Sequence, residues 1–107
     1  MSESKEQTIA QQLMGDFAPK LAELTDDVLF ADVWERIELS PRDRSIVTVA
    51  ALIANGNTAQ LTGHLKRAKA NGLSETELAE VMTHLAFYVG WPRAISAILV
   101  AKEVFQK

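Results

Sequence analysis

Apolar residues recur at helical spacing from the start of the chain. Ser4 and Gln7 fit a capping box, and Ile9, Leu13 and Phe17 follow at intervals of four residues. In an α-helix, residues four apart lie on one face. The pattern therefore predicts a short first helix near the N-terminus.

A second helical pattern begins at Pro19, a residue that suits the first turn of a helix. Its apolar stripe consists of Leu21, Leu24 and Val28. Thr25, followed by two aspartates, is also a suitable N-cap for a new helix that would run through Val33 and Trp34. The sequence leaves both possibilities open: one helix from Pro19, or a break at Thr25.

The clearest helix signal lies in the middle of the chain. Ser40, Pro41 and Asp43 provide an N-cap, a first-turn proline and an early carboxylate. Residues 46–54 are then apolar almost without interruption, and Asn55-Gly56 is a stop signal. We expect a central, buried helix here.

Two further helices are predicted behind the central one. Thr58 can cap the first of them, and Asn71-Gly72 ends it. Its inward stripe is expected to be Leu61, Leu65 and Ala68. Ser74 and Glu77 form a capping box for the next helix, which runs to Gly90. The apolar stripe of that helix consists of Leu78, Val81, Met82, Leu85 and Val89.

Pro92 begins a last helix in which residues 94–101 include a single polar side chain, Ser96. This is more apolar surface than one contact would bury. Phe87 adds to it, because it lies opposite the apolar stripe of its own helix. We therefore expect self-association. No strand pattern or repeat is present, so the predicted fold is all-α: a single-domain bundle of about six helices.

Composition supports one domain over residues 1–107, because half of this length would bury too small a core. A net charge of -3 with interspersed signs argues against nucleic acid as a partner. The longest apolar run is about half the length that spans a bilayer, which argues against a membrane protein. The first residues lack the apolar core of a secretory signal, and there are no cysteines. The cytoplasm is the expected compartment.

Four segments in register resemble the carboxymuconolactone decarboxylase family. They are LSPRDRSIVTVAALIA at 39–54, QLTGHLKRA at 60–68, NGLS at 71–74 and THLAFYVGWP at 83–92. Upstream, FAPKL and DVWER are also similar to single-domain members, so the resemblance covers about residues 17–105. It implies an all-helical fold with the active site on a helical hairpin and subunits assembled into rings, commonly trimers or hexamers.

The resemblance implies one of two chemistries. The branch similar to alkylhydroperoxidase D uses a Cys-x-x-Cys pair, a histidine four residues later and an upstream glutamate. Here His64 matches the histidine, but Asn57 and Gln60 stand at the cysteine positions and Ser45 at the glutamate position. A chain without cysteine cannot carry out thiol peroxidase chemistry.

The other branch resembles gamma-carboxymuconolactone decarboxylase, which lacks the cysteine pair and acts on a carboxylated lactone. Such a reaction needs an acid to supply a proton but no cofactor. His64 is the side chain best suited to exchange protons near neutral pH, and Arg44 or Arg42 can hold a substrate carboxylate. Ser45 leaves the chain one acid or base short at the glutamate position.

Each candidate also has an ordinary structural explanation. His64 and Gln60 can line a pocket, or they can be a hydrogen-bonded and a solvated side chain. His84 is expected to be structural, and a metal site shared by the two histidines and a glutamate is not predicted. Trp34, Tyr88 and Trp91 can line a ligand pocket or belong to a core or interface. The basic stretch Lys66, Arg67 and Lys69 fits a solvated face or, less readily, an anion site.

We therefore expect a cofactor-independent lyase or isomerase that acts on a small organic acid, with His64 as general acid and base. Its substrate-binding residues would come from the set Arg42, Arg44, Ser45, Gln60, Trp34, Tyr88 and Trp91. Two alternatives remain: a non-catalytic oligomer that binds a small molecule on the same scaffold, and a purely structural oligomer.

Overall fold

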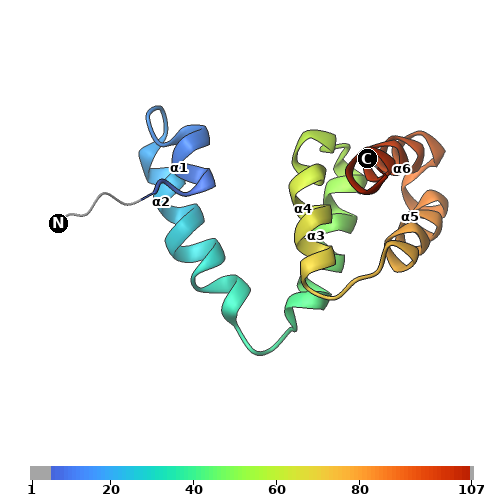
Figure 1. The fold of residues 1–107 in the computed structure, drawn as a ribbon, viewed down its shortest axis with the longest axis horizontal. Helices are drawn as coiled ribbons and strands as arrows, with labels where there is room; N and C mark the ends of the chain where they lie inside the picture. The colour runs from blue at the N-terminus through green and yellow to red at the C-terminus, as the bar shows by residue number, and fades with distance from the viewer. Residues whose placement is uncertain (1–5, 107) are drawn as a thin grey trace. The chain divides into compact units, whose positions relative to one another are not determined.

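The computed structural model describes residues 6–106, and all of its regular structure in that range is helical (Figure 1). The predicted all-α fold class is therefore confirmed. The chain divides into two compact units, the first ending at Glu38 and the second beginning at Leu39. One domain over the whole chain stays a prediction, and each unit is described by itself.

The first unit consists of four short elements. They are α1 (Ile9–Met14), α2 (Pro19–Leu24), the π-helix η1 (Thr25–Phe30) and the 3-10 helix η2 (Val33–Glu35). Thr8 caps α1, because its side chain accepts from the amide of Gln11 while the Gln11 side chain accepts from the amide of Thr8. The capping box expected at Ser4 and Gln7 is thus wrong for this helix, and Ser4 itself lies outside the described residues.

Thr25 is the first residue of η1 but does not act as the N-cap of a new helix. Its backbone is helical, with φ −61° and ψ −47°, whereas an N-cap residue needs an extended backbone. Its hydroxyl donates to the carbonyl of Leu21 at 2.8 Å, one turn back. The chain therefore passes from α2 directly into η1, and the alternative of a break at Thr25 is wrong.

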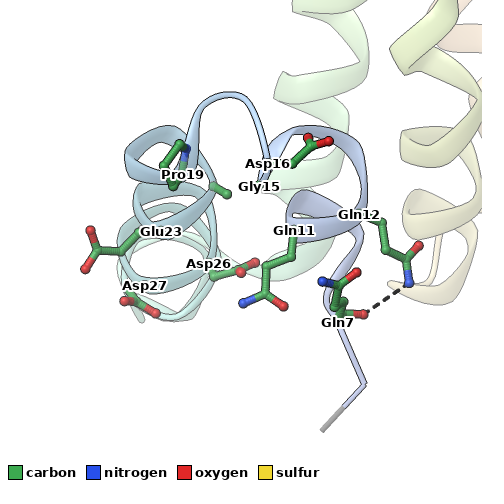
Figure 2. Close-up of a pocket in the computed structure, with 10 residues that line it drawn as sticks. Gln7, Gln11, Gln12, Gly15, Asp16, Pro19, Glu23, Asp26 and Asp27 are labelled. Carbon is green, nitrogen blue, oxygen red and sulfur yellow. Dashed lines mark hydrogen bonds between the residues drawn. The ribbon is translucent and has the colours of Figure 1, made fainter.

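The first unit has a small interior. Its buried apolar side chains are Ala10, Ala22 and Trp34, and the Phe30 ring stacks on Trp34 with centroids 6.2 Å apart. Large apolar side chains remain exposed at Ile9, Leu13, Phe17, Leu21, Leu24, Val28, Leu29, Val33 and Ile37. An open hollow of about 650 Å³ between α1 and the following helices is lined mostly by amides and carboxylates (Figure 2).

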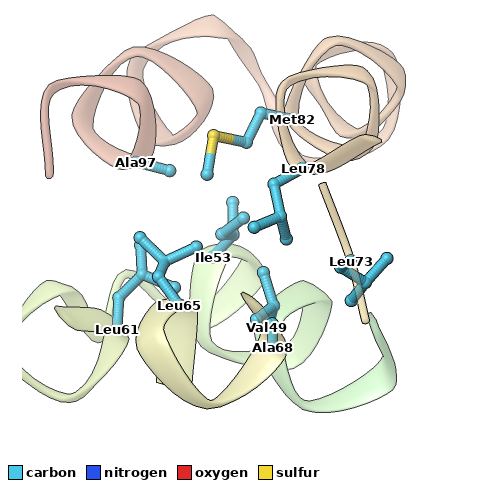
Figure 3. Close-up of a cluster of buried hydrophobic side chains, with 9 residues drawn as sticks. All are labelled: Val49, Ile53, Leu61, Leu65, Ala68, Leu73, Leu78, Met82 and Ala97. Atoms are coloured by element: carbon cyan, nitrogen blue, oxygen red, sulfur yellow. The ribbon is translucent and has the colours of Figure 1, made fainter. Parts of the chain in front are cut away.

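The second unit holds the main hydrophobic core. It contains α3 (Pro41–Asn55), α4 (Thr58–Ala70), α5 (Glu75–Val89) and α6 (Trp91–Phe105). Side chains of α5 and α6 meet those of α3 and α4 from the opposite side of the core (Figure 3). The core residues are Val49, Ile53, Leu61, Leu65, Ala68, Leu73, Leu78, Met82 and Ala97. The predicted inward stripe of α4, which consists of Leu61, Leu65 and Ala68, is buried.

The ends of these helices follow the capping signals with one exception. Ser40 caps α3, and Gly56 ends it in the left-handed conformation with φ 73°. Ser74 and Glu77 form the expected capping box at α5. The prediction for Thr58 is wrong, because the N-cap of α4 is Asn57, which makes no side-chain capping bond, and Thr58 is the first helical residue.

A buried polar contact fastens the beginning of α3 to the end of α4. Ser45 is 1% exposed, and its hydroxyl accepts a hydrogen bond from Asn71 Nδ2 at 3.0 Å. The same amide nitrogen lies 3.4 Å from the carbonyl oxygen of Pro41. On the surface, Arg42 of α3 forms an ion pair with Glu77 of α5. The start of α3 is thus held by both of its neighbours.

Replacing Asn71→Ala should lower the free energy of unfolding by about 1–3 kcal/mol, because it leaves the buried Ser45 hydroxyl without its donor. Chemical denaturation of Asn71→Ala, Ser45→Ala and the double variant measures this. The double variant should be more stable than the sum of the two single effects implies, since the two groups share one interaction. Strict additivity would contradict the role of this contact.

Candidate functional site

His64 lies in the middle of α4, at the border between its buried and exposed sides. The imidazole is partly buried, between the buried side chains of Leu61 and Leu65 and the exposed side chains of Gln60 and Arg67. Partial burial, and then the positive charge of Arg67, lowers the pKa of His64 below its usual value of about 6.5. The imidazole is therefore mainly neutral at pH 7 and able to accept a proton.

The side of α4 that carries His64 is the side next to α3. Asn71 follows His64 by seven residues, which is two helical turns, and it bonds to Ser45 of α3. Arg44 and Thr48 lie one turn apart on α3 and are both partly buried. The Thr48 hydroxyl donates to the carbonyl of Arg44 at 2.8 Å. The side of α4 that carries His64 and Asn71 is thus joined to α3 through the Asn71–Ser45 bond.

Gly63 leaves a gap in the polar side of α4. Gln60, Gly63 and Arg67 are spaced three and four residues apart, so they share one face beside His64. A Cβ atom built at Gly63 would have no atom within 4 Å. Glycine inside a helix is less favourable than alanine by about 1 kcal/mol, so the glycine at position 63 does not stabilise α4.

The two predicted carboxylate-binding arginines differ in their surroundings. Arg42 is held by Glu77 and lies 3.9 Å from Asp43, which satisfies its charge within the chain. Hydrogen bonding from the Ser74 amide, and also the charge of Arg42, holds the pKa of Glu77 below its usual range. Arg44 is partly buried near the start of α3.

The other predicted site residues are spread over both units. Trp34 belongs to the first unit and is buried. Tyr88 is 76% exposed and its ring lies 5.0 Å from that of His84, whereas Trp91 contacts Phe87 edge to face at 5.1 Å. Ser45 is buried against Asn71, as described above. The second unit by itself does not gather these aromatic side chains around His64.

Three hollows in the described residues have linings that do not include His64. In the first unit, the hollow of Figure 2 is lined by Gln7, Gln11, Gln12, Gly15, Asp16, Pro19, Ala22, Glu23, Asp26 and Asp27. In the second, an apolar groove of about 220 Å³ runs between α5 and α6, and a hollow of about 310 Å³ is bordered by Thr62, Lys66, Glu103 and Val104. Lys66 thus belongs to the side of α4 next to α6, and His64 to a different side.

Two features are absent from the part of the chain that the structure describes. Among residues 6–106, no group of three or more histidine, aspartate or glutamate side chains is arranged to hold a metal ion. In the same range, no helix is both long and apolar enough to cross a membrane.

Sequence reasoning left Arg67 and Gly63 out of the predicted site. The signal for both was their spacing from His64 and Gln60 along one helix. Arg67 was assigned with Lys66 and Lys69 to a basic stretch, although the three residues point in different directions. Lys69, for example, pairs with Glu75 and lies over the Phe105 ring.

Comparison with known proteins identifies the family. The model of the carboxymuconolactone decarboxylase family matches residues 19–103. A 4-carboxymuconolactone decarboxylase of Acinetobacter baylyi is 33% identical over 93 residues, which are 87% of this chain and 69% of that protein. A nitrosuccinic acid decarboxylase of Metarhizium robertsii is 32% identical over 81 residues, which are 76% of this chain but only 57% of that protein. The chain belongs to the carboxymuconolactone decarboxylase family.

Proposed function

We propose that this protein is a cofactor-independent lyase or isomerase that acts on a small carboxylated lactone or a related organic acid, with His64 as general acid and base. The observation that carries the proposal is the partly buried imidazole of His64 beside the cation of Arg67. A titratable group shifted by burial and by a specific charge, on a polar helix face, is typical of a reactive site.

The names of the two relatives support the class of substrate. They give 4-carboxymuconolactone and nitrosuccinic acid as the compounds that those proteins decarboxylate. Each compound carries an electron-withdrawing group, a lactone in one and a nitro group in the other. Such a group can accept the electron pair left when carbon dioxide departs. The protein then has to bind the acid and supply one proton.

In the proposed step, the bond between the substrate carbon and its carboxylate breaks, and the electron pair moves into the electron-withdrawing group. Carbon dioxide leaves, and protonated His64 gives its proton to the carbanion. Water then returns a proton to the imidazole. A bound carboxylate offsets the charge of Arg67, so it raises the pKa of His64 and lets the imidazole take up the proton that the step consumes.

Further residues have proposed supporting roles. Arg44 would bind a substrate carboxylate in a bidentate pair, and Gln60 would orient the imidazole or the substrate one turn away. Trp34, Tyr88 and Trp91 would offer apolar walls if the assembled protein brings them to the site. Because Arg42 is already paired with Glu77, its role would be to hold α3 in place.

A non-catalytic binding protein is the second candidate, and Ser45 is the observation that favours it. This position carries no carboxylate, and its hydroxyl is buried against Asn71. Any catalysis must therefore proceed without an acid or base at residue 45. Thiol peroxidase chemistry is not open to these 107 residues, which contain no cysteine.

We also propose that the protein assembles into a homo-oligomer, a trimer or a hexamer. Large apolar side chains gather around the turn between α5 and α6 and continue along α6. Those at least half exposed are Phe87, Tyr88, Trp91 and Leu99, with Ile95 at 49%. A soluble monomer seldom leaves so many neighbouring aromatic and aliphatic groups uncovered.

Replacing His64→Ala should reduce the turnover of 4-carboxymuconolactone or nitrosuccinate by about 10²–10⁴-fold, because the proton donor is lost. The free energy of unfolding should change by about 1 kcal/mol or less, since the imidazole is only partly buried. Steady-state kinetics and denaturation measure the two effects. His84→Ala, on the exposed side of α5, is the matched control and should keep its activity. Equal activity in both variants would contradict the role of His64.

The NMR titration of His64 in the free protein should have a midpoint below 6.5, and Arg67→Gln should raise it, because that variant removes one of its two causes. Lys66→Gln, which removes an equal charge from another side of α4, should raise it less. The folded pKa lies below the unfolded one, so stability should fall as the pH drops from about 6.5 through the folded pKa. This component should be missing in His64→Gln. A titration midpoint above 6.5 in the wild-type protein would contradict the lowered pKa of His64.

The intact protein should sediment as a trimer or hexamer of the 11.8 kDa chain at micromolar concentration. Phe87→Lys should shift the mass toward that of one chain, because a charge would have to be buried in the contact. Analytical ultracentrifugation measures the mass, and circular dichroism checks that the variant stays helical. A wild-type protein that sediments as a monomer would exclude the assembly.

A further inference from the structure

Gly63 differs from the other glycines of the chain. Gly56, Gly72 and Gly90 have positive φ angles, and a Cβ on Gly15 would come within 2.7 Å of the Gln11 carbonyl oxygen. Each of these four positions therefore disfavours a side chain. Gly63 has neither a positive φ angle nor any atom within 4 Å of the place where its Cβ would lie. Neither the backbone nor the packing of the described residues requires glycine there.

Gly63 lies well inside α4, five residues after its start at Thr58 and seven before its end at Ala70. Helix capping therefore does not explain it either. Glycine in this place weakens the helix and exposes the backbone to solvent. An open glycine inside a helix is useful where another molecule must approach the backbone closely.

The side chains around Gly63 are polar and positively charged. Gln60 lies one turn before it and Arg67 one turn after it, at the spacing that places residues on one face, and both are also one turn from His64. We propose that Gly63 is the contact floor of the ligand site, meaning the part of the helix surface against which the bound molecule packs. A small organic acid would lie against the backbone of α4 there, with a carboxylate on Arg67 and its reacting carbon near His64. This inference rests on the proposed function, because it takes the same site and the same class of ligand.

The chemistry of this face fits an acid better than a helix of a second copy. The exposed apolar side chains suited to a subunit contact gather on α5 and α6 instead. A carboxylate can form a bidentate pair with Arg67. The missing side chain of Gly63 then leaves room for the body of the acid.

The test compares Gly63→Ala with the wild-type protein, using succinate as a probe that carries two carboxylates but no electron-withdrawing group. Gly63→Ala should raise the melting temperature by roughly 2–6 °C, because alanine favours the helix. It should also weaken succinate binding by about tenfold or more, as measured from the shift of the His64 ring signals by NMR. Greater stability with weaker binding cannot come from a damaged fold.

Thr83→Ala is the matched control. Thr83 is exposed on α5, and its replacement also raises helix propensity, but it should leave succinate binding unchanged. Gly63→Leu extends the series and should abolish binding while the chain stays helical.

The outcomes separate this inference from the proposed function. If Gly63→Ala binds succinate as tightly as the wild-type protein does, the contact floor is wrong, while the reaction at His64 still stands. If the variant instead changes the sedimenting mass, Gly63 is a subunit contact and the inference is overturned. A wild-type protein that binds succinate but turns over neither acid would support the floor and refute the enzyme. A wild-type protein that does not bind succinate would refute the floor.

Discussion

The packing of α3 against α4 determines which side chains of these helices are buried and which remain available for chemistry. Val49 and Leu65 have no exposed surface, and Ser45 and Asn71 join the two helices at one end. Once this seam is fixed, the 3.6-residue period of α4 leaves no freedom in where His64 lies. It falls at the edge of the seam. Interiors are close-packed, so a small shift of α3 would change the packing along this seam directly.

The partial burial of His64 connects this packing to chemistry. The pKa of a fully exposed imidazole would be set by water, and a fully buried imidazole could not contact a substrate. At the edge, burial and the neighbouring Arg67 both favour the neutral form. In the proposed function, the same cation would attract an acid, and a bound acid would reverse the electrostatic effect on the ring. Substrate and proton would then arrive at the site together, which suits a reaction that consumes one proton for each carboxylate lost.

Much of the fold was predictable, because its signals are local. Ser40, Ser74 and Gly56 act through bonds to residues a few positions away, and a single sequence contains that information. Where several local candidates compete, the outcome was harder to foresee. The caps Thr8 and Asn57 were missed, and the passage through Thr25 was left open, since a threonine can cap a helix or bond back to the preceding turn.

The site was less predictable than the fold. The importance of His64 came from a family resemblance, and its chemical role is still a proposal. The buried contact of Ser45 depends on Asn71, which lies 26 residues away, and no periodicity links the two. The pairing of Arg42 with Glu77 spans 35 residues. Such contacts follow from the tertiary packing of three helices, so a one-dimensional pattern contains the partners but not their pairing.

The position of α6 in the chain has a consequence for synthesis. Ala97 belongs to the core, and Val100, Ala101 and Phe105 pack against it, so one wall of the second unit comes from its last helix. While the ribosome is still making this segment, the α3–α4 pair exposes Leu61 and Leu65 to water. The unit therefore completes its core only after translation has passed Phe105. In that interval the exposed apolar side chains make the incomplete unit prone to aggregation.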